Sequence, residues 1–222
     1  IHGISERAKN LSSGEWIRAW GYSEFHLKEK RHPNRHDLDK ACSEHPVALK
    51  HRSGHGCVLN TKAMKLLRIS DQTADSENGV IERDSDGFPT GITWEMNYDI
   101  DAKMPQFKQD EIALGGTLAT KLLLSQGFTS GQDATFDNDL SRWQLWHGIK
   151  AQGLFPLRAV VMPGVDYLDQ FIEAGLSPNP DEMNLRLGPV KLMPLMTSGS
   201  LQPSVEEFRA QVLKAHRYGF QV

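Results

Sequence analysis

The sequence LRAVVM at residues 157–162 is an apolar run with an amphipathic helical pattern on each side, and this arrangement decides the fold. The pattern before the run ends at Gly153, and the pattern after it ends at Gly175. Three further apolar runs lie near residues 129, 187 and 221. Together with the run at 158, they are separated by 29, 29 and 34 residues. Apolar runs that alternate with helices at this spacing are typical of βα units, which require a parallel sheet.

The last helix of this series has the clearest boundaries. Ser204 and Glu207 form a capping box at its start, and Gly219 follows its last turn. The segment 106–222 is therefore expected to hold three complete βα units and the start of a fourth strand. The pattern does not distinguish a doubly wound sheet from a (β/α)8 barrel, because strands and helices alternate in both.

Residues 1–105 have a different pattern of apolar residues. Their apolar runs are short and lack a regular period, and polar stretches separate them. Asn60 is expected to cap a short helix, and the segments 80–83 and 90–94 flank an Asp86-Gly87 turn, which predicts a β-hairpin. We therefore predict two parts, a mixed α/β subdomain over residues 1–105 and the βα part that follows it.

Composition and charge exclude several classes of protein. The 222 residues include 25 Lys and Arg and 28 Asp and Glu, so there is no basic excess that would bind nucleic acid. The apolar runs are far too short to cross a membrane. Cys42 and Cys57 are the only cysteines, too few for a disulfide framework or a cysteine-based zinc site. Two reduced thiols are typical of a cytoplasmic protein.

The ends of the sequence predict a longer protein. The chain begins at Ile1 without a basic and apolar leader, and it stops at Val222, just after an apolar run has begun. Because a domain rarely ends on the first residues of a buried strand, we expect the chain to be an internal piece.

Three charged residues follow predicted strands. Lys191 lies in the apolar stretch GPVKLM at residues 188–193. If its ammonium group is buried there, it must be paired with an anion or chemically modified. The alternative is that the ammonium group reaches water at the end of the strand. Asp133 follows a short strand and is a candidate substrate contact or the cap of the next helix. Glu95 follows the hairpin and is a candidate substrate contact or an ordinary surface acid.

Ser53 lies between His51 and His55, which raises the alternative of a serine nucleophile with a histidine base. The segment lacks the first glycine of a Gly-x-Ser-x-Gly turn, and adjacency in sequence does not establish the geometry of a triad. None of the nine histidines forms a His-x-His pair, and the sequence has no glycine-rich phosphate-binding loop.

Six strings resemble, in order and spacing, the family-3 branch of the amidohydrolase superfamily, and within it the proteins similar to N-substituted formamide deformylase. They are GEWIRAWGY at 14–22, HRSGH at 51–55 with the following Asn60, GITWE at 91–95, GFTSGQDA at 127–134, GPVKLM at 188–193 and AHRYGFQV at 215–222. The resemblance extends from about residue 14 to the end of the chain.

The resemblance implies an α/β fold that is part of a (β/α)8 (TIM) barrel. Residues 106–222 would supply about strands 2–4 and the start of strand 5, with residues 1–105 as an inserted mixed α/β subdomain. The implied activity is hydrolysis of carbon–nitrogen bonds in amide-type small molecules by a metal-activated water, with one or two divalent cations, usually zinc.

The family also implies a set of site residues. Its metals are held by a His-x-His pair on strand 1, a carboxylated lysine on strand 4, histidines on strands 5 and 6, and an aspartate on strand 8. Lys191 matches that lysine, so it is the candidate catalytic and metal-binding residue, as a carbamate in the complete protein. The candidates for substrate binding are Arg52, His55, Glu95 and Asp133.

The sequence departs from the family because only Lys191 of this ligand set is present. We therefore expect no carbamate, no metal and no activity in the isolated chain. The alternative is a non-catalytic binding or assembly module derived from the same fold. Because a slice of a barrel exposes strand edges and apolar helix faces, we also expect the chain to form a homodimer.

Overall fold

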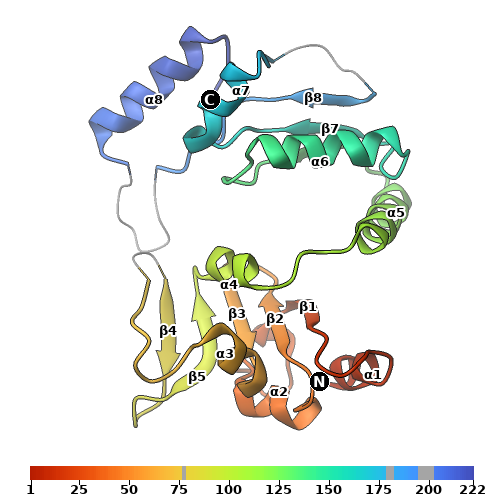
Figure 1. Cartoon of the computed structure of the whole chain (residues 1–222), viewed down its shortest axis with the longest axis vertical. Helices are drawn as coiled ribbons and strands as arrows, with labels where there is room; N and C mark the ends of the chain where they lie inside the picture. The colour runs from red at the N-terminus through yellow and green to blue at the C-terminus, as the bar shows by residue number, and fades with distance from the viewer. Residues whose placement is uncertain (77–78, 179–182, 195–202) are drawn as a thin grey trace. The chain divides into compact units, whose positions relative to one another are not determined.

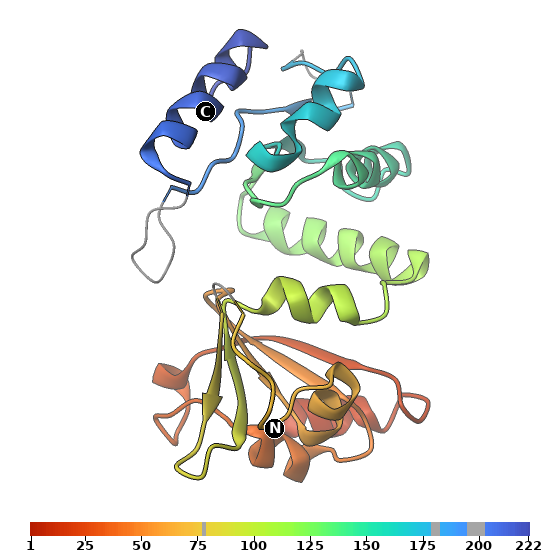
Figure 2. The same ribbon diagram turned by 60° about the vertical axis from the view of Figure 1, so that its left-hand side comes forward.

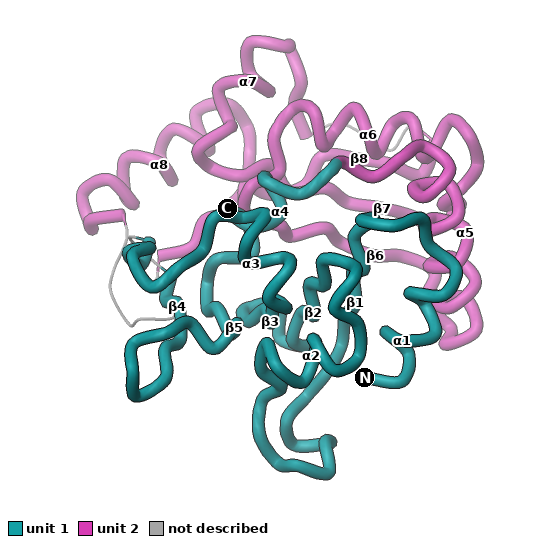
Figure 3. The backbone as a smooth tube through the Cα atoms, turned by 60° about the horizontal axis from the view of Figure 1, so that its bottom comes forward, with its two compact units in different colours: residues 1–105 teal, residues 106–222 magenta. Residues whose placement is uncertain are grey.

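The structure is a computed structural model that describes residues 1–76, 79–178, 183–194 and 203–222 (Figure 1). It divides into two compact units, unit 1 over Ile1–Pro105 and unit 2 over Gln106–Val222 (Figure 3). In the part of the chain that is described, no helix is long and apolar enough to span a membrane.

Unit 1 is built on a five-stranded sheet with the strand order β1-β2-β3-β5-β4. β1 and β2 are parallel, and the other neighbouring strands are antiparallel. The strands are β1 (Ile17–Tyr22), β2 (Val47–His51), β3 (Gly56–Leu59), β4 (Val80–Arg83) and β5 (Pro89–Trp94).

Helices pack on both faces of this sheet, because apolar side chains alternate along its central strands. Val58 of β3 packs with Ile4 of α1 and Leu38 of α2. Its neighbour Cys57 lies on the other face, in a cluster with Met64 of α3. The helical segments are α1 (His2–Ala8), the 3-10 turn η1 (Glu24–His26), α2 (Arg35–Ala41), α3 (Thr61–Leu67) and α4 (Asn97–Lys103).

Two local predictions for unit 1 are confirmed. Asn60 caps α3, since its Oδ1 accepts a hydrogen bond from the N–H of Ala63 at 2.9 Å. β4 and β5 form the predicted hairpin, in which the N–H of Gly87 donates to the Asp84 carbonyl at 3.0 Å. Gly87 has a φ of 85°, a backbone conformation that glycine adopts without steric cost.

Unit 2 contains a parallel sheet with the order β6-β7-β8, so the predicted α/β character is confirmed. The strands are β6 (Ser130–Asp133), β7 (Arg158–Val161) and β8 (Leu185–Leu187). The helical segments are α5 (Gln109–Ser125), α6 (Leu140–Ala151), the 3-10 turn η2 (Val165–Tyr167), α7 (Leu168–Glu173) and α8 (Val205–Arg217). The predicted capping box of Ser204 and Glu207 begins α8.

The end of unit 2 differs from the prediction, because no strand forms near residue 221. The Gln221 carbonyl accepts one hydrogen bond, from the N–H of Val190 at 2.7 Å. A single bond of this kind does not make a ladder.

α6, α7 and α8 pack on one face of the unit 2 sheet. Val161 of β7 and Leu187 of β8 belong to one buried cluster with Phe171 of α7 and Ala215 of α8. The alternate residue of β8, Arg186, is exposed on the opposite face, which we call the open face. Helices on one face of a parallel sheet are typical of a (β/α) barrel, whereas a doubly wound sheet has helices on both faces.

α5 (Figure 2) carries one row of exposed apolar side chains, whereas its Leu123 packs against the buried cluster of unit 2. Leu114, Leu118 and Leu122 recur every four residues and are 60 %, 56 % and 58 % exposed, and no residue of this helix is buried. β6 is an edge strand whose first three residues are also exposed. The described part of unit 2 therefore presents an apolar helix face and an open strand edge.

Candidate functional site

Unit 1 brings together His55 and Glu95, which lie forty residues apart in the sequence. His55 immediately precedes β3 and Glu95 immediately follows β5, and these two strands are antiparallel partners. The Glu95 N–H donates to the His55 carbonyl at 2.8 Å, and His55 Nδ1 lies 3.1 Å from Glu95 Oε2. The strand register therefore continues past the strand ends and holds the two side chains in contact.

Glu95 has an unusual backbone. Its φ of 56° is in the left-handed region, which costs a non-glycine residue about 1–2 kcal/mol. Its Oε1 atom is buried and lies 3.0 Å from His55 Nδ1, but it has no hydrogen-bond donor with acceptable geometry among the described residues. Strain and an unsatisfied acceptor on one residue are typical of a functional position rather than an ordinary surface acid.

Asn97, which the sequence did not single out, ties the first turn of α4 to the same place. Its Nδ2 donates to the carbonyl of Gly54, directly before His55. Its Oδ1 is buried and, within the described residues, has no donor. Glu95 and Asn97 thus contribute two buried acceptors beside the β2–β3 turn.

Ser53 lies in this turn and His51 ends β2. Together with Glu24 they are joined in the order serine, histidine, carboxylate, as in a catalytic triad. His51 Nδ1 is 2.7 Å from Ser53 Oγ, and His51 Nε2 is 3.0 Å from Glu24 Oε2. The same Nδ1 also accepts the Ser53 N–H at 3.2 Å, and Ser53 Oγ accepts the His55 N–H at 3.2 Å. These additional bonds are those of a turn capped by its own side chains.

Glu24 is a member of this cluster that no sequence motif indicated. Burial raises the pKa of its carboxyl, but a hydrogen bond from its own backbone and the nearby His32 and His51 lower it below the ordinary value. Aromatic rings enclose His51: its ring centroid is 5.0 Å from that of Tyr22 and 6.4 Å from that of Trp94. The surrounding rings fix the orientation of the imidazole.

Arg52 is exposed in the β2–β3 turn. Its backbone N–H donates to the Tyr22 carbonyl at 2.9 Å, which joins the turn to the end of β1. Within the described residues, its guanidinium makes no hydrogen bond or ion pair. Its role in substrate binding stays a prediction.

Asp133 ends β6 and lies on the helix side of the sheet, because it pairs in register with the buried Val161. Its Oδ1 accepts from the Thr135 hydroxyl at 2.6 Å, and its Oδ2 accepts from Trp146 Nε1 at 3.0 Å. Burial raises the pKa of Asp133, but these hydrogen bonds outweigh it and lower the pKa below its ordinary value.

These contacts show what Asp133 does locally: it fastens the connection between β6 and α6. It does not cap α6, since the side chain of Asp139 accepts from the Arg142 N–H at the start of that helix. Its role as a substrate contact stays a prediction.

Lys191 lies beyond the end of β8 and extends the sheet by an isolated parallel bridge with Gly164. Its N–H donates to the Pro163 carbonyl at 2.7 Å, and its carbonyl accepts from the Val165 N–H at 3.0 Å. The preceding residue, Val190, is in the buried helix-side cluster, so alternation along the extended backbone places Lys191 on the open face. The residue is half-buried.

The donor set of the described residues does not complete a metal centre. No group of three or more His, Cys, Asp or Glu side chains in this part of the chain is placed to hold a metal ion. A carboxylated Lys191 would supply one anionic ligand. A stable divalent site needs three or four protein ligands.

Comparison with known proteins places the chain in a family. The sequence model of the amidohydrolase family matches residues 1–222, which is the entire chain. The chain belongs to the amidohydrolase family. The resemblance inferred from the six strings is thereby confirmed.

Two curated relatives of this amidohydrolase chain are considerably longer. YtcJ of Bacillus subtilis (strain 168), which is named as an amidohydrolase, is 27 % identical over 175 residues, or 77 % of this chain and 33 % of YtcJ. The N-substituted formamide deformylase of Arthrobacter pascens is 34 % identical over 92 residues, or 41 % of this chain and 17 % of the enzyme. The alignments thus span a third or less of these relatives.

Two solved structures share the fold. They are uncharacterized metal-dependent hydrolases from Pyrococcus furiosus, with a TM-score of 0.59, and Pyrococcus horikoshii OT3, with a TM-score of 0.62. Both are 21 % identical to this chain and match 98 % of it, but only 47 % and 46 % of their own lengths. At this identity the similarity establishes the fold alone.

Proposed function

We propose that this chain is one part of a longer metal-dependent hydrolase that cleaves carbon–nitrogen bonds of small amide-type molecules through a metal-activated water. The observation that carries the proposal is the position of Lys191, on the open face just past the C-terminal end of a parallel strand. Active sites of (β/α)8 barrels lie at that end of the strands. Membership of the amidohydrolase family supports the reaction class.

The corresponding fold proposal is that β6, β7 and β8 are strands 2, 3 and 4 of a (β/α)8 barrel. The one-sided packing of α6, α7 and α8 supports a barrel over a doubly wound sheet. In this arrangement unit 1 is a subdomain inserted ahead of strand 2.

The proposed metal is zinc, and Lys191 is the one ligand that this chain would contribute. Carboxylation converts its cationic amine into an anionic carbamate, which is a suitable oxygen ligand for a divalent cation. The remaining ligands must come from outside the described residues. We therefore propose that the isolated chain neither retains metal nor catalyses hydrolysis.

His55 and Glu95 are the proposed substrate contacts, together with Arg52 in the same turn. An imidazole N–H can donate to the carbonyl of an amide, and the partly exposed Glu95 carboxylate can accept from the N–H of the amide. Asp133 is a further candidate, although its carboxylate already accepts a hydrogen bond from Trp146.

The test uses the complete gene product, its Lys191→Ala variant and the present chain. We expect near-stoichiometric metal and release of formate from N-substituted formamides by the complete protein only. Lys214→Ala, which removes a surface lysine paired with Asp169, is the matched control and should retain both properties. Full metal content in the Lys191→Ala protein would contradict the proposal. A complete protein without metal or hydrolysis would favour the binding or assembly module.

A serine hydrolase centred on Ser53 is a second candidate, since Ser53 Oγ is 2.7 Å from His51 Nδ1. An oxyanion needs free backbone donors, but the N–H groups of Ser53, Gly54 and His55 all donate within the turn. We expect no labelling by a fluorophosphonate. Labelling that disappears in Ser53→Ala would establish this alternative.

We also propose that the isolated chain forms a homodimer through the exposed leucines of α5 and the open edge of β6. An exposed apolar helix face and an unpaired strand edge each favour association, and an identical chain is always present. The proposed location is the cytoplasm. In support of it, both cysteines are free thiols, with Cys57 buried and Cys42 half-buried.

A further inference from the structure

His51, at the end of β2, uses one ring nitrogen for two contacts with Ser53. Its Nδ1 accepts the backbone N–H of Ser53 at 3.2 Å and lies 2.7 Å from Ser53 Oγ. Its Nε2 lies 3.0 Å from Oε2 of Glu24. Because a backbone N–H can only donate, Nδ1 carries no hydrogen, and Nε2 carries the one that Glu24 accepts. The ring is therefore a neutral imidazole in a single tautomer.

Ser53 transmits this arrangement to His55. Its Oγ accepts the backbone N–H of His55 at 3.2 Å, so its own hydrogen is directed to His51 Nδ1. His55 in turn contacts the Glu95 carboxylate through its ring. Hydrogen bonds thus run in one series from Glu24 to a proposed substrate contact.

The Glu24 carboxylate is shared between two histidines. His32, in the connection between η1 and α2, has its Nδ1 3.9 Å from the same Oε2 and 3.1 Å from the Tyr22 hydroxyl. The ring centroids of Tyr22 and His32 lie 5.0 and 5.7 Å from that of His51. The adjacent Arg52 side chain is exposed to water. Because either histidine can take up a proton beside this carboxylate, a test must follow each ring separately.

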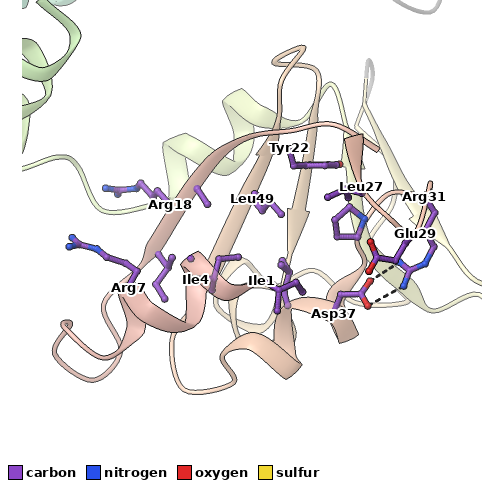
Figure 4. Close-up of a pocket in the computed structure, with 15 residues that line it drawn as sticks. Ile1, Ile4, Arg7, Arg18, Tyr22, Leu27, Glu29, Arg31, Asp37 and Leu49 are labelled. Carbon is purple, nitrogen blue, oxygen red and sulfur yellow. Dashed lines mark hydrogen bonds and ion pairs between the residues drawn. The ribbon is translucent and has the colours of Figure 1, made fainter. Parts of the chain in front are cut away.

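Two further charged groups of the same connection, Glu29 and Arg31, line a cavity of about 350 Å³ on the α1 and α2 side of the sheet (Figure 4). Arg31 donates to Asp37 at 2.7 and 3.1 Å, and Glu29 interacts with the same guanidinium. Among the described residues, the carboxylate bonded to His51 is that of Glu24.

We propose that Glu24, His51 and Ser53 are positioning residues that hold His55 for substrate binding, and that protonation of His51 releases it. The inference rests on the proposed function of His55 and Glu95. Histidine changes its charge between about pH 5 and 8. A second ring hydrogen would occupy Nδ1 and face the Ser53 N–H, which cannot reverse its direction. The serine hydroxyl can reverse and accept, so the backbone bond is the one that is lost.

The first test observes the ring in the present chain. Nitrogen-15 NMR of labelled histidine distinguishes protonated from unprotonated ring nitrogens, and the signals absent from His51→Asn assign those of His51. We expect hydrogen on Nε2 and none on Nδ1 at neutral pH. As His51 takes up a proton, the Ser53 amide should lose about fivefold of its protection against hydrogen exchange, the effect of one hydrogen bond.

His51→Asn also tests the pH dependence. Asparagine keeps an acceptor atom close to the position of Nδ1 but does not titrate, so protection of the Ser53 amide should no longer fall in acid. His26→Asn, which removes an exposed histidine of η1, is the matched control and should keep the wild-type profile. Hydrogen on Nδ1 at neutral pH, a profile unchanged by His51→Asn, or a loss of protection that follows His32 instead would overturn the proposal.

The second test measures kcat/KM in the complete protein. Ser53→Ala should lower it about fivefold, whereas Ser53→Thr keeps the hydroxyl and should retain the wild-type value. His51→Asn should likewise be more active than His51→Ala. Hydrolysis that is equal in Ser53→Ala and Ser53→Thr would overturn the positioning role alone. A complete protein without hydrolysis would refute the proposed function, and with it the substrate role of this series.

Discussion

His55 Nδ1 lies 3.0 Å from Oε1 and 3.1 Å from Oε2 of Glu95, so that one ring nitrogen faces both oxygens of the carboxylate. A partly exposed histidine–carboxylate contact of this kind contributes only about 0–1 kcal/mol to stability. The left-handed backbone of Glu95 costs at least as much. Stability therefore does not account for the arrangement, which is the reason to test it for function.

The first prediction concerns His55→Ala in the complete protein. We expect the free energy of unfolding to change by less than about 1 kcal/mol, because the imidazole is half-exposed. We expect kcat/KM to fall by about tenfold or more, the effect of one lost hydrogen bond to a substrate. Steady-state kinetics and urea unfolding measure the two effects.

His26→Ala, at an exposed position of η1, is the control for His55→Ala. Unchanged kinetics in His55→Ala, or a loss of stability that accounts for the lost activity, would assign the pair a purely structural role.

The second prediction concerns the backbone of Glu95. Glycine adopts a φ of 56° freely, whereas alanine is strained there as glutamate is. Glu95→Gly should therefore be more stable than Glu95→Ala by about 1 kcal/mol, although glycine usually destabilises a chain. Both variants lack the carboxylate, so both should lose activity in the complete protein. Thermal unfolding compares them, and the reverse order of stability would refute the strain.

The elements that could be predicted from the sequence are those whose determinants are adjacent in the chain. The capping boxes and N-caps at Asn60 and Ser204 need only a few neighbouring residues, and so does the hairpin around Gly87. The βα rhythm of residues 106–222 is likewise a local alternation of apolar runs and amphipathic helices. These features depend on no long-range register.

The candidate site could be predicted only in part, because its geometry depends on strand pairing. Glu95 meets His55 through the register of β3 and β5, and Glu24 meets His51 across twenty-seven residues. Asp133 faces α6 because of its register with a buried residue of β7. A one-residue shift in that register would have turned its carboxylate to the open face.

The third prediction concerns self-association through α5. Leu118→Glu places a charge in the middle of the exposed leucine row and should shift the chain from a dimer to its monomer mass of 24.9 kDa. Leu66→Glu changes a leucine of similar exposure in unit 1 and should leave the dimer intact. Light scattering at micromolar concentration measures the mass. A wild-type mass of 24.9 kDa at every concentration would refute the dimer.

The last prediction uses the lowered pKa of Asp133. A carboxyl whose pKa is lower in the folded state stabilises the fold above its unfolded pKa of about 3.9, and this contribution is lost as the pH falls through the folded pKa. Asp133→Asn should therefore lower the free energy of unfolding by about 1–3 kcal/mol at neutral pH, because it weakens the bonds from Thr135 and Trp146. The difference between wild type and variant should shrink progressively in increasingly acidic buffers.

Urea unfolding followed by tryptophan fluorescence measures this difference in the free energy of unfolding. Asp166→Asn, at an exposed position, controls for the loss of one negative charge. A difference that stays constant from neutral to acidic pH would mean that the ionised carboxylate of Asp133 does not stabilise the β6–α6 connection.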